Sequence, residues 1–161
     1  VYCESRVGHN TPGDVEHKIP SSKDRTKHFN WFNLTIACTE CNRRKRDYYE
    51  ACDGFLDPYV DNPDDHLEHN GPVVTPKVGS ARAEVCVETL KLCSAERLPL
   101  VAQKIAKLEE LHQVLVRYNT EAPGPLKEIL KRRLSDMAKP SAEYSAMVRD
   151  ALRVKGYVEV I

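Results

Sequence analysis

A Cys-x-x-Cys pair, Cys38 and Cys41, constrains the fold of this chain more than any other feature of its sequence. Thiolates at this spacing form a knuckle that can close a tetrahedral zinc site with ligands from elsewhere in the chain. A dense basic stretch follows the pair, which favours zinc in a reducing compartment over a disulfide in a secreted protein. Three further cysteines, Cys52, Cys86 and Cys93, lack such spacing, and we interpret them as buried or free thiols.

The charges of the chain balance in total but not along the sequence. Among its 161 residues, 24 lysines and arginines face 24 aspartates and glutamates, so the formal net charge is zero. This balance argues mildly against a nucleic-acid enzyme, which often has a basic surplus. The run Arg43, Arg44, Lys45 and Arg46 is strongly basic, however, whereas residues 57–68 are acidic. We therefore expect this run to contact nucleic acid, with a solvated helix face as the alternative.

The length and hydropathy of the chain indicate a small protein without a membrane span. A chain of 161 residues suits one compact domain, or a small module with a helical extension. No apolar run approaches the ~20 residues that cross a bilayer, and no signal peptide is visible. Because the chain begins at Val1 rather than at a methionine, we expect it to be a fragment whose natural start is missing.

The hydrophobic pattern divides the chain into a site-bearing module, residues 1–80, and a helical region, residues 81–161. In the first, a short strand is expected at 15–19 and a helix from about Asn42. Most prolines and glycines fall in residues 53–79, which predicts loops with a possible hairpin around Asn70-Gly71. In the second, apolar residues repeat at three- and four-residue steps. The predicted helices span residues 81–93, 98–118, 126–137 and 140–154, the last with Pro140 in its first turn.

Three short segments contain the residues best suited to catalysis. They are residues 15–20 with Glu16 and His17, residues 30–34 with Asn33, and residues 37–45 with Asn42. Each segment alone is a weak signal, because a Glu-His pair is usually a surface feature and an Asn before Leu is usually a turn or a cap. Together, within about thirty residues, they indicate one small active site.

This combination suits the hydrolysis of a phosphodiester bond. The reaction needs a base beside a water molecule, and a histidine such as His17 is largely neutral at working pH. It also needs a cation beside the scissile phosphate, and the oxygens of Glu16 and Asn42 suit Mg²⁺. One difficulty is that neighbours on a strand point to opposite faces, which separates Glu16 from His17 unless a bulge near Pro20 bends the strand.

The same segments resemble the HNH endonucleases, whose motif reads Asp/Glu-His, then Asn, then His or Asn after the second knuckle cysteine. More narrowly, the chain is similar to the HNH subunits of bacterial anti-phage Septu and retron-associated systems. The similarity is specific over residues 2–49 and looser to about residue 100. It rests on Tyr2-Cys3-Glu4, Val15-Glu16-His17, Trp31-Phe32-Asn33-Leu34, Cys38-x-x-Cys41-Asn42-Arg43-x-Lys45, Leu56-Asp57-Pro58 and Asn62-Pro63-x-x-His66.

The resemblance implies an α+β fold in which a ββα-metal motif with a zinc knuckle precedes a mainly α-helical C-terminal region. It implies that His17 activates the water and that Asn33 holds the loop that orients His17. Glu16 and Asn42 would bind the catalytic Mg²⁺ or Mn²⁺. The family often has histidine at the third position, and an amide is a weaker ligand than a charged group, so we expect low metal affinity.

The resemblance also implies a structural Zn²⁺ site. Cys3, Cys38 and Cys41 match three of its four ligands. The fourth would lie just upstream of Val1, unless His9 replaces it. This zinc is distinct from the nuclease cation, because thiolates close a structural site whereas the catalytic ion needs an open, oxygen-rich position.

We therefore predict a metal-dependent HNH endonuclease that cleaves nucleic acid, DNA in preference to RNA, as the effector of a cytoplasmic anti-phage complex in bacteria. The resemblance implies an ATPase partner, for which the helical region offers a surface. Three alternatives stay open: a catalytically inactive zinc-knuckle module that binds nucleic acid, an RNA-cleaving nuclease, and a protein-interaction adaptor. Asp57 and His66 are weaker site candidates, and four histidines are expected at the surface: His9, His28, His69 and His112.

Overall fold

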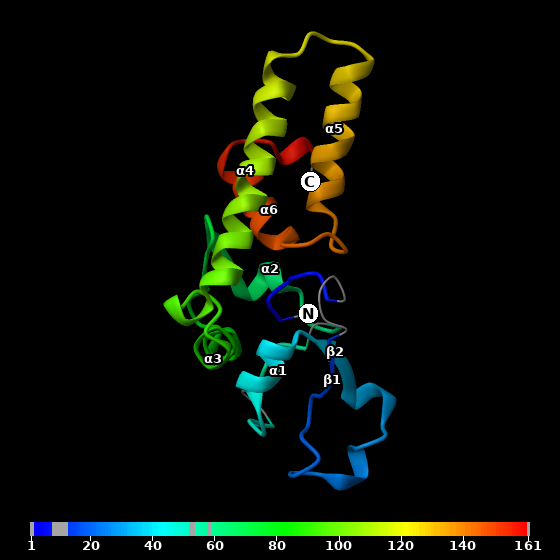
Figure 1. The fold of residues 1–161 in the computed structure, drawn as a ribbon, viewed down its shortest axis with the longest axis vertical. Helices are drawn as coiled ribbons and strands as arrows, with labels where there is room; N and C mark the ends of the chain where they lie inside the picture. The colour runs from blue at the N-terminus through cyan, green and yellow to red at the C-terminus, as the bar shows by residue number, and fades with distance from the viewer. Residues whose placement is uncertain (1, 8–12, 52–53, 58, 161) are drawn as a thin grey trace. The chain divides into compact units, whose positions relative to one another are not determined.

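The fold is α+β, as predicted, and its first regular elements follow the ββα order (Figure 1). The computed structural model describes residues 2–7, 13–51, 54–57 and 59–160. Strands β1 (Asp14–His17) and β2 (Leu34–Ala37) pair antiparallel, with His17 opposite Leu34. Helix α1 (Thr39–Lys45) follows directly, with Cys38 as its N-cap. The predictions for His9 and Cys52 lie outside the described residues.

The β1–β2 hairpin has one buried and one exposed face because side chains alternate along a strand. Glu16 and its partner Thr35 are buried, whereas Val15 is 67% exposed. The pairing is regular from Asp14 to His17, without a bulge. The predicted strand at 15–19 therefore ends two residues early, because the backbone of Ile19 bonds to a side chain instead of to β2.

Residues 18–33 connect the two strands and form a loop that extends away from α1 (Figure 1). It contains two short 3-10 turns, η1 (Arg25–Lys27) and η2 (Trp31–Asn33). Each begins with an acceptor side chain, as short turns favour. Asp24 accepts a hydrogen bond from the Thr26 amide, and Asn30 accepts one from the Phe32 amide. These caps give the loop a defined conformation.

Two compact units make up the chain, and the first comprises residues 1–67 and 75–92. Besides the ββα elements it contains α2 (Pro63–His66) and α3 (Ala81–Leu90). Ala83 and Cys86 of α3 pack with Leu56 in its core. Helix α3 therefore belongs to this unit, whereas the division drawn from the sequence at residue 80 placed it with the helical region.

A second hairpin confirms the turn predicted from Asn70-Gly71. Strands β3 (Leu67–Asn70) and β4 (Val73–Pro76) pair with each other. Gly71 has a φ of +61°, a conformation that glycine adopts without the strain of a Cβ atom.

The second unit comprises residues 68–74 and 93–161 and is largely helical. A short turn, η3 (Ala95–Arg97), leads into α4 (Leu98–Thr120), and α5 (Pro125–Ala138) and α6 (Ser145–Val154) follow before a last turn, η4 (Val158–Val160). The sequence left open whether the apolar repeat of α4 forms core or a partner interface; Leu111 and Leu115 of this repeat lie in one core, whereas Ile105 is 43% exposed. The buried members of this core are Leu111, Val114, Leu115, Leu130, Leu134, Met137, Ala138, Val148, Leu152 and Val160.

The start predicted for the last helix, at Pro140, is wrong. The helix begins at Ser145 because Tyr144 has a φ of +55°, which no helical turn allows. The Tyr144 ring is buried, and its hydroxyl donates to Gln103 Oε1 at 2.8 Å. Burial of this ring thus overrides the helix signal of the preceding proline.

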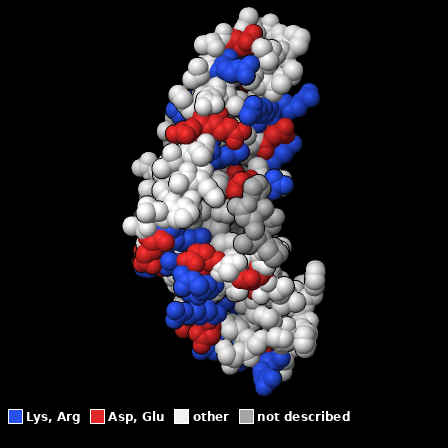
Figure 2. Space-filling model, viewed as in Figure 1, with Lys and Arg blue, Asp and Glu red and all other residues white. Residues whose placement is uncertain are grey.

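Two predictions about charge and hydropathy can be compared with the surface. On the face shown in Figure 2, lysines and arginines lie among aspartates and glutamates. Within the described part of the chain, no helix is both long and apolar enough to cross a bilayer.

Candidate active site

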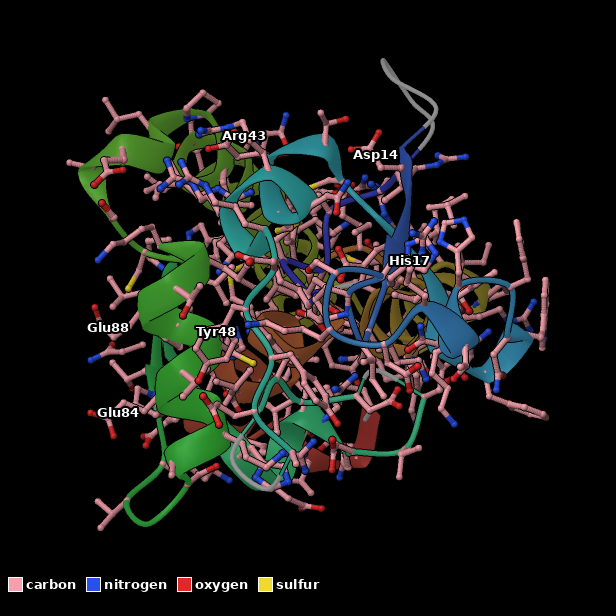
Figure 3. All side chains as sticks on the ribbon, turned by 90° about the horizontal axis from the view of Figure 1, so that it is seen from below. Asp14, His17, Arg43, Tyr48, Glu84 and Glu88 are labelled. Carbon is pink, nitrogen blue, oxygen red and sulfur yellow. The ribbon has the colours of Figure 1, made fainter. Side chains whose placement is uncertain are left out.

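Two polar pairs connect β1 to α1. Asp14 and Glu16 lie two residues apart on the strand and share a face, while Asn42 and Lys45 lie three apart on the helix and share another. The Asn42 amide donates to Asp14 Oδ2 at 3.1 Å. The Lys45 ammonium lies 2.6 Å from Glu16 Oε1. The two elements are therefore cross-linked at two successive positions, and Figure 3 shows Asp14 and His17 on the same strand.

The Glu16–Lys45 pair is withdrawn from water. Each side chain is only 1% exposed, and the Phe55 ring lies 5.9 Å from the ammonium. Lys45 also donates to the backbone carbonyl of His17 at 2.9 Å. Burial raises the pKa of the Glu16 carboxyl above its ordinary value, although the hydrogen bond and charge of Lys45 oppose this shift. The pair holds the strand segment before and at His17 against α1.

His17 leaves β1 on the opposite face, as the alternation of side chains predicted. Its Nε2 lies 3.0 Å from the backbone oxygen of His28. A carbonyl oxygen only accepts hydrogen bonds, so Nε2 must carry the proton. In the neutral ring the lone pair is then on Nδ1, and no described residue hydrogen-bonds to that atom. The geometry makes Nδ1 the atom that can accept a proton from water.

His28 is more than the surface residue that the sequence predicted. Its ring stacks on that of His17, with centroids 4.7 Å apart and planes 17° apart. Its Nδ1 lies 2.6 Å from the hydroxyl of Ser21, and it is only half-buried. His28 thus fixes His17 twice, through its backbone oxygen and through its ring.

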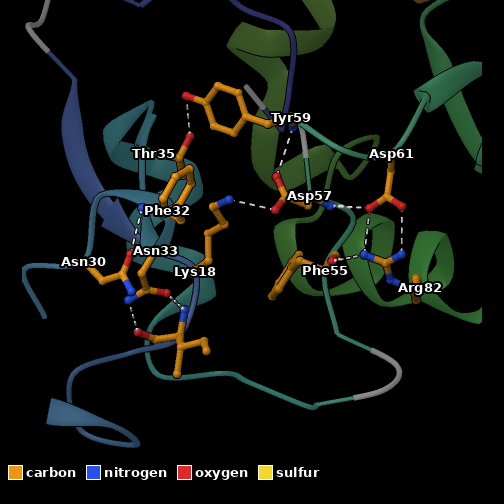
Figure 4. A network of polar contacts seen from close by, with 11 residues as sticks. Lys18, Asn30, Phe32, Asn33, Thr35, Phe55, Asp57, Tyr59, Asp61 and Arg82 are labelled. Carbon is orange, nitrogen blue, oxygen red and sulfur yellow. Dashed lines mark hydrogen bonds and ion pairs between the residues drawn. The ribbon is translucent and has the colours of Figure 1, made fainter. Parts of the chain in front are cut away.

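Asn33 is buried and binds the segment that follows β1 (Figure 4). Its Oδ1 accepts from the Ile19 amide at 2.7 Å, and its Nδ2 donates to the Ile19 carbonyl at 3.0 Å. The same Nδ2 donates to the Lys27 carbonyl at 3.1 Å. Its backbone oxygen accepts from the Lys18 amide at 2.8 Å. These are the contacts that a loop-holding role requires.

The two weaker site candidates make structural contacts. Asp57 Oδ2 pairs with the ammonium of Lys18 at 2.7 Å (Figure 4). His66 Nδ1 lies 2.9 Å from the hydroxyl of Ser80. Asp57 therefore binds Lys18, the residue that follows His17 in the sequence. The contact of His66 connects α2 to Ser80, the N-cap of α3.

The predicted zinc cysteines come together. The sulfurs of Cys3, Cys38 and Cys41 all lie within 4.8 Å of one another, and Cys3 and Cys41 are buried. The Cys3 and Cys38 sulfurs are 3.6 Å apart, close to the roughly 3.8 Å that two thiolates span on a tetrahedral zinc. The arrangement fits zinc as three of its four ligands. Hydrogen bonds from Cys38 and Cys41 also lower the pKa of the Cys3 thiol far below its usual range, and the thiolate is the form that binds metal.

The other cysteine and histidine predictions have mixed outcomes. Cys86 is a buried thiol, as predicted, and burial raises its pKa to about 11. Cys93 is half-buried, with its thiol 3.3 Å from the Val74 carbonyl. His112 is exposed, as predicted. The surface prediction for His69 is wrong, because its side chain is 5% exposed and lies 3.4 Å from the Asp150 carboxylate.

The four residues of the basic run occupy different environments. Arg43 and Arg44 both bond to Glu40, at 2.8 Å and 2.6 Å. The hydrogen bond from Arg43, with that from Arg44, lowers the pKa of the Glu40 carboxyl to about 2. Lys45 is buried, whereas Arg46 is exposed and ends the helix at a φ of +51°. Lys45 is the one member of the run whose charged group faces the interior in this structure.

Sequence reasoning missed three contributions to this site: Asp14, the role of Lys45 and the role of His28. The spacing of Asp14, two residues before Glu16, was a usable signal, because it places both carboxylates on one strand face. Nothing in the sequence distinguished Lys45 from its basic neighbours without the phase of α1. His28 gave no local signal, because it reaches His17 only through the fold of the loop.

The N-terminal residues match a family of nucleases. Residues 1–47, which include β1, β2, α1 and the clustered cysteines, match the family of HNH endonucleases. The chain is 28% identical over 163 residues to the Septu protein PtuB of Bacillus thuringiensis, covering 94% of this chain and 63% of the length of that protein. No solved structure matches the chain. These matches confirm the resemblance predicted from the motifs: the chain is similar to HNH endonucleases over residues 1–47 and to a Septu protein over most of its length.

Proposed function

We propose that this chain is a metal-dependent nuclease that hydrolyses phosphodiester bonds in anti-phage defence, with His17 as the general base. The hydrogen bond from His17 Nε2 to the His28 carbonyl is the observation that carries the proposal. It fixes the tautomer of the neutral ring and leaves Nδ1 as the basic atom. The match of residues 1–47 to HNH endonucleases supports the reaction class.

In the proposed reaction, His17 Nδ1 accepts a proton from the water that attacks the phosphorus. The P–O bond to the leaving sugar oxygen breaks as the new P–O bond forms, and the leaving oxygen takes a proton from solvent. Stacking on His28 and the hydrogen bonds of Asn33 keep the ring in place as the proton is transferred. The Lys45 contact to the His17 carbonyl fixes the backbone at the same residue. These contacts supply orientation, which accounts for a large part of the rate in enzymes that act on one positioned water.

We propose that Mg²⁺ or Mn²⁺ would bind between β1 and α1, where Asp14, Glu16 and Asn42 carry oxygen ligands of the kind that these ions take. Binding would require the Glu16 carboxylate to exchange its buried contact with Lys45 for the ion. Such an ion would neutralise charge that develops on the scissile phosphate and the leaving oxygen. Glu16 and Asn42 stay the predicted ligands, and we add Asp14 because it contacts Asn42 directly. Because Lys45 already compensates Glu16, we expect weak binding of the metal.

The substrate and the partner rest on resemblance. The similarity to a Septu protein supports a nuclease that is the effector of a defence complex, and the systems that the motifs resemble imply an ATPase partner in the bacterial cytoplasm. We propose DNA as the preferred substrate, with RNA as the alternative. The exposed side chains of the basic run, Arg43 and Arg46 foremost, would contact phosphates.

A non-cleaving module that only binds nucleic acid is the second candidate. It is favoured by one observation, that the Glu16 carboxylate is buried and already paired with Lys45. A carboxylate compensated in this way does not need a metal ion to neutralise it. The two candidates differ in whether any divalent metal supports cleavage.

The deciding experiment incubates the chain, alone and with its partner complex, with plasmid DNA and with total RNA, in Mg²⁺, in Mn²⁺ or without added divalent metal. We expect metal-dependent cleavage that a His17→Ala variant loses by at least about 100-fold. His112→Ala, which changes an exposed histidine on α4, is the matched control and should cleave normally. Cleavage by the His17→Ala variant at the normal rate would refute the assignment, and salt-sensitive binding without cleavage in any metal would favour the binding module.

A further inference from the structure

Three large aromatic side chains project from the loop that holds the base. Phe29 is 90% exposed, Trp31 80% and Phe32 84%. Such rings normally bury about 150–250 Å² each in a core or an interface. Here they add nothing to the core of their unit. We call residues 25–33, which carry them, the aromatic loop.

The conformation of the aromatic loop is held by hydrogen bonds at its turns. The Asn30 amide donates to the Lys27 carbonyl at 3.0 Å, and the Asn33 amide donates to the Asn30 carbonyl at 2.9 Å. The side chain of Asn30 accepts from the Phe32 amide at 2.9 Å. The backbone that carries the rings is therefore held in one conformation, which lowers the entropy cost of binding a ligand.

The aromatic loop is also the loop that positions the proposed base. His28 lies next to Phe29, with their rings edge to face at 4.4 Å, and its backbone oxygen accepts from His17. Whatever stacks on Phe29 therefore lies one ring away from the His17–His28 stack. A ligand stacked on Phe29 would therefore lie close to the proposed base.

The surroundings of the rings favour an anionic ligand. Lys23 and Arg25 are exposed and Lys27 is half-buried, while the acidic residue among them, Asp24, uses its Oδ1 to accept from Thr26. An open pocket of about 480 Å³ adjoins the loop. It is lined by Ser21, Ser22, Arg25, His28 and Phe29.

We propose that the aromatic loop binds unpaired nucleotides, with bases stacked on Phe29, Trp31 and Phe32 and phosphates beside Arg25 and its basic neighbours. Interleaved aromatic and basic side chains are how proteins bind single strands, because every base has a face to stack on and every nucleotide has a phosphate. Bases within an intact duplex cannot offer their faces. The proposal rests on the proposed function and specifies its substrate as a single-stranded or locally unpaired segment.

Trp31 is the only tryptophan of the chain, so its fluorescence reports on this loop alone. The His17→Ala variant of this chain, in buffer without added Mg²⁺ or Mn²⁺ and without chelator, is titrated with oligothymidylate and with a duplex of equal length. We expect the single strand to quench the fluorescence and to bind at least about tenfold more tightly than the duplex. Phe29→Ala and Phe32→Ala should each weaken single-strand binding roughly 5- to 100-fold and leave duplex binding nearly unchanged.

Phe32→Leu separates stacking from apolar docking, because leucine keeps an apolar side chain without an aromatic face. Under the proposal it weakens oligothymidylate binding about as much as alanine does. Val154→Ala, at an 86% exposed position on α6, is the control and should have no effect. Circular dichroism of each variant checks that the fold is intact.

Two results would overturn the inference: fluorescence that saturating oligothymidylate leaves unchanged, or quenching by the partner protein and not by the oligonucleotide. The wild-type cleavage assay separates this failure from that of the proposed function. Cleavage of duplex DNA without quenching by single strands refutes the stacking and leaves the nuclease intact. Quenching without cleavage in any metal supports the stacking and refutes the nuclease.

Discussion

The ammonium of Lys45 lies 2.6 Å from Glu16 Oε1, and each of the two side chains is only 1% exposed. The same ammonium donates to the His17 carbonyl. One lysine of α1 therefore holds the side chain of Glu16 and the backbone of His17, two adjacent residues of β1. The ion pair therefore contributes both to the stability of the ββα elements and to the position of the His17 backbone, and this contribution can be measured.

Removing one partner of this pair should be costly. Lys45→Met leaves Glu16 as a buried carboxylate without compensation, and we expect the free energy of unfolding to fall by about 3–5 kcal/mol. Urea unfolding followed by circular dichroism measures the change. The double variant Glu16→Gln/Lys45→Met should recover much of the loss, because no charge is then left unpaired. Arg46→Met alters the exposed neighbour and should change stability by less than about 0.5 kcal/mol. A Lys45→Met protein as stable as the wild type would contradict the buried pair.

The raised pKa of Glu16 predicts a pH dependence of stability. A carboxyl whose pKa is higher in the folded state binds more protons there, so stability falls as the pH rises from the ordinary glutamate pKa, near 4.3, through the folded value. The Glu16→Gln/Lys45→Met variant lacks this titration. We therefore expect the stability of the wild type, minus that of the double variant, to decrease as the pH rises above about 4. A difference that rises over this range would contradict the direction of the shift.

Asn33→Asp tests the contacts that hold the loop. Aspartate keeps the acceptor for the Ile19 amide but loses the donor that serves the carbonyls of Ile19 and Lys27. We expect kcat of the proposed nuclease to fall about 10- to 100-fold, because His17 loses its orientation. KM should change little, because the substrate keeps its binding site. Asn30→Asp is a matched control in the same loop. Asn30 uses its side-chain oxygen as an acceptor, so aspartate preserves its contact.

Loss of a knuckle cysteine should release zinc and destabilise the N-terminal unit. We expect elemental analysis to find one zinc ion per chain, and a Cys41→Ser variant to lose it together with a large part of its thermal stability, because structural zinc supplies folding free energy directly. Cys93→Ser is the control, since the Cys93 thiol contacts a backbone carbonyl outside the cluster. Equal zinc content in the two variants would contradict the assignment of the site.

How far the sequence predicts this structure depends on the range of the interaction. The knuckle, the Asn70-Gly71 turn and the repeat of α4 are local signals, and all three appear where they were expected. The burial of Lys45 depends on the phase of α1 against β1, which no local pattern contains. The contact of His28 with His17 spans eleven residues of loop, and the late start of α6 follows from a buried ring. The sequence suggested that residues 43–46 form one basic patch, whereas packing buries Lys45 and leaves Arg46 exposed.

Because Lys45 is buried and Arg46 is exposed, we expect substitutions of these two neighbours to affect nucleic-acid binding differently. Arg46 is exposed, and Arg43 is exposed beside Glu40, so each can neutralise a phosphate. Under the proposed function, Arg46→Ala should lower the slope of log K against log salt by about one and weaken binding of all sequences alike. Arg43→Ala should have a smaller effect, because Glu40 already compensates that guanidinium. Lys45→Met should leave the slope unchanged in whatever fraction stays folded, because its ammonium faces Glu16 and not the solvent. Fluorescence anisotropy over a salt series with the His17→Ala background measures all three, and a reduced slope for Lys45→Met would show that Lys45 leaves Glu16 to bind phosphate.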